Sequence, residues 1–105
     1  MPSTADDARA RIEAVVADVR RRLLAELPER VARNAALARA AVSGDAAAAD
    51  ALRIDLHSLA GSAGTVGLPA LGAQARALEM EILSATEARV WPAGFADRVA
   101  ALAAD

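Results

Sequence analysis

The sequence predicts an all-helical domain built around one core: an antiparallel four-helix bundle with an additional N-terminal helix. Hydrophobic residues make up 55% of the chain, yet Trp91 and Phe95 are its only aromatic residues. Thirty-one residues are alanine, the best helix former. Apolar residues also recur at helical spacing along most of the chain. A length of 105 residues suits a single domain, so residues 1–105 are expected to fold as one unit.

The first helix is expected from about residue 5 to about residue 27. Thr4 followed by Asp7 resembles a capping box, a side-chain pair that starts helices. Its apolar residues are spaced by one to four positions: Ile12, Val15, Val16, Val19, Leu23 and Leu27. A second helix is expected to begin at Pro28, because proline fits the first turn of a helix, and to end at Ser43-Gly44.

Three further helices follow. Asp45 is a favourable cap for a third helix over about residues 45–66. Gly67 can adopt the left-handed conformation that ends a helix, and Pro69 opens a fourth helix over about residues 69–85. A short fifth helix is expected to carry Phe95, Val99 and Leu102. The short connections between these helices imply that neighbours run antiparallel.

Composition excludes several classes of function. A net charge of −2, from 12 basic and 14 acidic residues, offers no field that would attract nucleic acid or anionic lipid. The absence of cysteine excludes disulfides and thiolate metal sites. The longest apolar runs are far below the roughly 20 residues that span a bilayer, and no signal peptide is recognisable. We therefore expect a cytoplasmic protein with no membrane insertion.

The single histidine, His57, lies in the middle of the third expected helix. At about 100° per residue it lies roughly 140° from the centre of the apolar arc, so it should face solvent. The neighbours on its side of the helix are Arg53, Ala60, Gly61 and Gly64. Two of these four neighbours have no side chain.

A glycine inside a helix costs about 1 kcal/mol relative to alanine, so two of them beside an exposed histidine indicate that another surface approaches closely. A neutral imidazole at such a place is an available nucleophile. An ordinary surface histidine remains an alternative. No metal site is expected, because the chain has no second histidine. Acid/base catalysis is disfavoured because Asp55, the only nearby carboxylate, lies about 160° away on the helix.

The run from His57 to Leu68, followed by Leu71 and Ala75-Arg76-Ala77-Leu78-Glu79, resembles the signature of the histidine phosphotransfer (HPt) family. The resemblance implies an HPt-like bundle in which His57 is phosphorylated, Gly61 makes room for the partner and Ser62 supports the helix pair. The family usually has lysine where this chain has Ala60, and the chain contains no lysine. Arg53, about 40° from His57 on the helix, is the nearest possible substitute; as an alternative it is a plain surface arginine.

The resemblance also implies a function. The chain would be a carrier without kinase activity, relaying a phosphoryl group between aspartates of receiver domains in a two-component phosphorelay. Its partners would be response-regulator receiver domains or a hybrid sensor kinase, it would act as a monomer, and any Mg²⁺ would sit on the receiver, so it needs no cofactor. One alternative is a degenerate module that binds a receiver or kinase without being phosphorylated. Another is a domain phosphorylated directly by an ATP-bound kinase.

Overall fold

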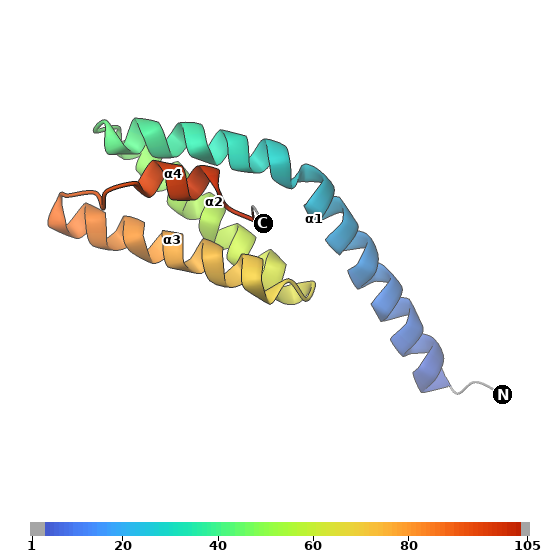
Figure 1. Cartoon of the computed structure of the whole chain (residues 1–105). Helices are drawn as coiled ribbons and strands as arrows, with labels where there is room; N and C mark the ends of the chain where they lie inside the picture. Colours follow the sequence, from blue (N-terminus) through green and yellow to red (C-terminus); the bar gives the residue numbers. More distant parts are fainter. Residues whose placement is uncertain (1–3, 104–105) are drawn as a thin grey trace.

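The computed structural model describes residues 4–103 and contains four helices and no strand within that range (Figure 1). The helices are α1 (Thr4–Val42), α2 (Ala46–Thr65), α3 (Pro69–Ala88) and α4 (Phe95–Ala100). Helix α2 packs against both α3 and α1, and α4 packs against α1. The predicted all-helical class is confirmed.

The prediction of a separate N-terminal helix was wrong, because residues 4–42 form one continuous helix with Pro28 inside it. The same buried stripe continues through this point, with Leu23 and Leu27 before Pro28 and Ala35 after it. Burial of both halves against one core holds the helix together, while the proline ring removes one backbone hydrogen bond and favours a bend. Figure 1 shows α1 curving so that its N-terminal part leaves the bundle.

The turns between helices agree with the sequence prediction. The Asp45 carboxylate caps α2 by accepting a hydrogen bond from the backbone N–H of Ala48 at 3.0 Å. After α2, Gly67 takes a left-handed conformation with φ of 76°, and the N–H of Leu68 donates to the carbonyl of Ala63 at 2.8 Å. This hydrogen bond closes a Schellman motif, and Pro69 then occupies the first turn of α3. The chain therefore reverses tightly, which places α3 beside α2.

The core lies between α1, α2 and α3 and is closed by α4. It is largely aliphatic, as the composition predicted, with Phe95 of α4 as its one fully buried aromatic side chain. The ring of Trp91 packs against Phe95 with 4.9 Å between the ring centroids. The largest fully buried aliphatic side chains are Leu52, Leu56, Leu59, Ile82, Val66 and Val99. Three of these are leucines of α2, so the core determines which face of α2 remains exposed.

A polar cluster joins α1 to α2 on the side away from His57. The Arg30 guanidinium Nε lies 3.1 and 2.9 Å from the two carboxylate oxygens of Asp55. The buried Asn34 amide donates to the same carboxylate at 2.6 Å. Burial by itself raises the pKa of Asp55, but the hydrogen bonds from Arg30 and Asn34 outweigh it and hold the pKa below its usual value of 3.8.

Asp55→Asn is expected to lower the free energy of unfolding at pH 7 by about 1–3 kcal/mol, because it leaves a partly buried arginine without its charged partner. Since the pKa of Asp55 is depressed on folding, this stabilisation is complete above pH 3.8 and is lost as pH falls through the lower pKa of the folded state. Urea unfolding at several pH values tests this. Asp50→Asn, on the exposed surface of α2, is the control; equal stability of both variants would contradict the prediction.

Candidate functional site

His57 projects from the middle of α2 into solvent, with 75% of its side chain exposed. Leu56 and Leu59 on the same helix are fully buried, so the face of α2 that carries His57 points away from the core. The orientation predicted from the helical wheel is therefore confirmed. An incoming group can reach the imidazole without any rearrangement of the core.

Glu79 of α3 forms a hydrogen bond with the imidazole of His57. Nδ1 of His57 lies 2.8 Å from Oε2 of Glu79, and only 12% of the Glu79 side chain is exposed. A carboxylate can only accept hydrogen bonds, so a neutral imidazole in this contact carries its proton on Nδ1. The lone pair then lies on Nε2, the nitrogen that makes no hydrogen bond to a described residue. The pair thus presents an oriented nucleophile on an exposed face.

No role was predicted for Glu79, although it ends the run of residues that resembles the HPt signature. A signal was nevertheless present in the spacing about the turn: His57 precedes Gly67 by ten residues, and Glu79 follows Leu68 by eleven (67 − 57 and 79 − 68). Residues at nearly equal distances from a tight turn lie close to each other in an antiparallel helix pair. Glu79 also directly follows the buried Leu78, at the edge of the face that α3 packs on α2.

The two glycines beside His57 form an open shelf. Gly61 and Gly64 are both exposed, and a Cβ atom added to either would meet no neighbouring atom within 4 Å. Neither glycine is needed for packing in this structure. Gly72 of α3 differs, since a Cβ there would lie 3.4 Å from the carbonyl oxygen of Ala60. The bare surface expected next to the imidazole is therefore present.

The remaining predicted site residues are Ala60, Ser62 and Arg53, all on α2. Ala60 is buried where α2 meets α3, so its expected position on the exposed face was wrong. A residue three positions after His57 lies about 60° round the helix, which here turns it towards α3. Ser62 is half-buried beside the shelf, and its supporting role stays a prediction.

The side chain of Arg53 bonds to Asp50 rather than approaching His57. Its Nη2 lies 2.9 Å from Oδ1 of Asp50, which is one turn further from His57 on α2. Its predicted role as the substitute cation stays untested. In this arrangement the guanidinium charge is engaged at the N-terminal part of α2.

A shallow hollow of about 460 Å³ lies beside the imidazole. Its walls come from α1 and from the C-terminal half of α2 with its cap residue: Val19, His57, Ser58, Gly61, Ser62, Thr65 and Val66. Val19 belongs to α1, so the N-terminal helix contributes to the surroundings of the site. Among residues 4–103 there is no cluster of three metal-ligating side chains and no helix long and apolar enough to cross a membrane.

Comparison with protein families adds one finding. A family model described as the Hpt domain matches residues 18–105, which is most of the chain. Comparison with curated proteins and with solved structures gave no match. The matched segment contains His57, Glu79 and the glycine shelf, whereas the first 17 residues lie outside it.

Proposed function

Because the chain belongs to the histidine phosphotransfer (Hpt) family, whose members are phosphocarrier modules of two-component systems, we propose that His57 relays a phosphoryl group between receiver aspartates. The observation that carries the proposal is the exposed imidazole whose Nδ1 is hydrogen-bonded to the largely buried Glu79. The open shelf of Gly61 and Gly64 supports it, because a receiver must bring its aspartyl phosphate to the ring.

The transfer needs only groups that the two proteins supply. Nε2 of His57 attacks the phosphorus of the aspartyl phosphate; the N–P bond forms, the P–O bond to aspartate breaks, and the receiver carboxylate leaves. The proton stays on Nδ1, so the phosphorylated ring is a cation that the Glu79 carboxylate stabilises. In the second transfer the aspartate of another receiver attacks the same phosphorus and Nε2 leaves. Each step conserves the phosphoryl group, so no nucleotide is consumed.

In this proposal the chain acts as a monomeric carrier and holds no cofactor of its own. Any Mg²⁺ would belong to the receiver, which would contribute most of the groups that neutralise the phosphoryl oxygens. Receiver domains and the receiver of a hybrid kinase are the proposed partners. The open shelf of Gly61 and Gly64 supports such a partner, and the described residues contain no glycine-rich nucleotide-binding loop.

The second candidate function is a degenerate module that binds a receiver or kinase without being phosphorylated. The observation that favours it is Ala60, which stands where the family usually has lysine. A missing cation weakens the stabilisation of the transition state while leaving the docking surface in place.

The deciding experiment is incubation of the protein with receiver domains phosphorylated by a small phosphodonor. We expect radiolabelled phosphate to move to the chain in a form that is labile in acid and stable in alkali, as a phosphohistidine should be. Loss of label from the receiver without gain on the chain would contradict the relay. Binding of the receiver without any transfer would identify the degenerate module.

A further inference from the structure

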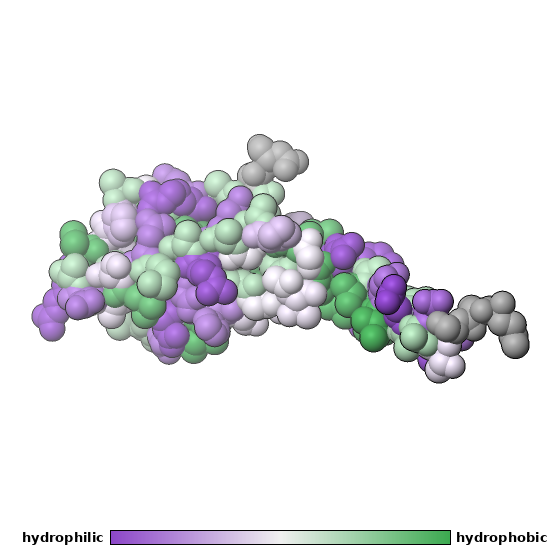
Figure 2. Space-filling model, turned by 90° about the horizontal axis from the view of Figure 1, so that it is seen from below, coloured by the Kyte–Doolittle hydropathy of each residue, from purple (hydrophilic) through white to green (hydrophobic). Residues whose placement is uncertain are grey.

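The N-terminal part of α1, residues 4–22, projects beyond the bundle and is called the arm below (Figure 1). Most of the arm precedes residue 18, where the family match begins. One side of the arm is apolar and exposed: Ile12, Val15 and Val19 are 64%, 62% and 42% exposed. Figure 2 shows a green, hydrophobic area on the projecting helix, next to near-white surface of the bundle. No described residue covers this stripe.

The stripe is continuous with the surroundings of His57. Residues 12, 15 and 19 lie on one face of a helix, because spacings of three and four residues return to the same side. Val19 is the residue of the stripe nearest the bundle. It lines the same hollow as His57 and Gly61. Ile12 lies seven residues further out, which is about 10 Å along the helix axis.

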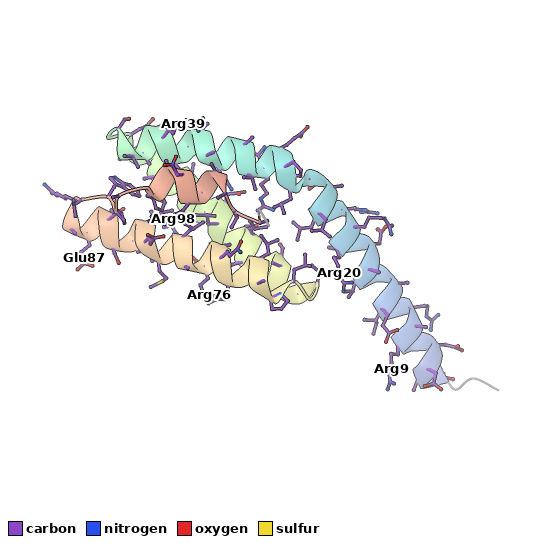
Figure 3. The ribbon with its side chains drawn as sticks, viewed as in Figure 1. Arg9, Arg20, Arg39, Arg76, Glu87 and Arg98 are labelled. Atoms are coloured by element: carbon purple, nitrogen blue, oxygen red, sulfur yellow. The ribbon has the colours of Figure 1, made fainter. Side chains whose placement is uncertain are left out.

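The base of the arm is fixed to the bundle. Nε of Arg20 donates a hydrogen bond to the carbonyl oxygen of Val66, at the C-terminal end of α2, over 2.7 Å (Figure 3). On the neighbouring turns, Val16 packs against the core and Leu23 is buried in it. The direction in which the arm leaves the bundle is thus set by contacts on both sides of Val19.

We infer that the arm is a second wall of the docking surface, and that its apolar stripe contacts the receiver domain seated on His57. The inference rests on the proposed function. A domain of about 100 residues has a radius of gyration near 13 Å, so one centred over His57 overhangs the hollow and reaches the stripe. The receiver would present an apolar patch there. Exposed apolar surface beside a site commonly marks such an interface.

The test uses the full chain with Ile12→Gln and Val15→Gln combined, so that polarity changes without added charge. Transfer from a phosphorylated receiver is followed in single turnovers at increasing receiver concentration. We expect the half-saturating concentration to rise about tenfold or more, while the maximal rate stays within about twofold. The matched control is Val90→Gln, because Val90 is 65% exposed beyond α3, at the end of the bundle away from the arm. Gly61→Gln, which adds bulk beside His57, should weaken docking as a positive control.

The outcomes separate the two proposals. Failure of the wild type to accept phosphate overturns the proposed function itself. Transfer by the wild type with an unchanged half-saturating concentration in the double variant overturns the role of the arm alone. A wild-type dimer in sedimentation analysis that the double variant converts to monomer would also overturn it, because the stripe would then bind a second copy.

A different observation, the register of α2 against α3, concerns the cation that Ala60 does not supply. Gly72 of α3 approaches the carbonyl of Ala60, and Glu79 contacts His57. Arg76 lies between these two contacts, four residues after Gly72 and three before Glu79, on the same side of α3. It therefore lies level with Ala60 along the helix pair, and its exposed side chain projects from α3 into solvent (Figure 3).

We propose that Arg76 supplies from α3 the positive charge that the family usually places at position 60 on α2. This proposal also rests on the proposed function. An arginine side chain is long and its planar guanidinium can donate two hydrogen bonds to phosphoryl oxygens. None of the hydrogen bonds or ion pairs described within residues 4–103 engages the Arg76 guanidinium, whereas that of Arg53 is bonded to Asp50.

Arg76→Ala is expected to slow the maximal rate of transfer to His57 by about tenfold or more, with the half-saturating receiver concentration within about twofold. Arg76→Lys should restore part of the rate, because it returns the charge without the bidentate geometry. Arg39→Ala, at an exposed arginine near the C-terminal end of α1, is the matched control and should transfer at nearly the wild-type rate. A wild-type rate in Arg76→Ala, or a larger loss in Arg53→Ala, would overturn the assignment.

Discussion

His57→Gln is expected to take up no phosphate from any receiver, while its thermal stability stays close to that of the wild type. Glutamine has no nucleophilic nitrogen, and no other described side chain combines exposure, an orienting carboxylate and an open shelf. The side chain is 75% exposed, and substitutions at such surface positions usually change stability by less than about 0.5 kcal/mol. Receiver binding should persist, since the shelf of Gly61 and Gly64 is unchanged.

The measurement is acid-labile label on the variant after incubation with phosphorylated receiver, beside a thermal melt and a binding titration. Ser58→Ala is a useful control, because Ser58 is exposed next to His57 and lines the same hollow. Label that persists in His57→Gln would show that another residue is phosphorylated, and the site proposed here would be wrong.

Glu79→Ala is expected to slow transfer to and from His57 by about ten- to a hundredfold. The carboxylate at 2.8 Å keeps the proton on Nδ1 and stabilises the cationic ring once Nε2 is phosphorylated. Without this carboxylate the imidazole is free to rotate and to place its proton on Nε2. The lone pair then lies on Nδ1, so Nε2 is no longer a nucleophile. The transfer rate of Glu79→Gln should lie between those of the wild type and Glu79→Ala. The amide oxygen can accept the hydrogen bond but supplies no negative charge.

Single-turnover rates at saturating receiver concentration measure this effect, with circular dichroism to confirm that the bundle is intact. Glu87→Ala provides the matched control, since Glu87 is an exposed glutamate near the end of the same helix. A positioning role predicts that the maximal rate falls while receiver affinity is preserved. If affinity falls and the maximal rate does not, Glu79 contributes to docking instead.

Local features of the chain were sufficient to predict much of the fold. Asp45, Gly67 and Pro69 act within a few residues of themselves, so the cap, the left-handed turn and the start of α3 follow from the sequence. The exposure of His57 follows in the same way, because the leucines of α2 define a single apolar face. Such features depend on one helix or one turn, and helical periodicity describes them well.

Contacts between helices were decided only by the tertiary structure. Pro28 alone suggested a new helix, but burial of Leu27 and Ala35 against one core keeps α1 continuous. Glu79 and Ala60 acquire their surroundings from the register of α2 against α3. The periodicity of either helix alone does not specify this register, and the spacing about the turn indicates it only approximately. The sequence by itself thus determined the helical class, the turns and the exposed histidine. Packing determined which carboxylate orients that histidine and where the arm projects, because both depend on groups far apart in the chain that are brought together by a shared core.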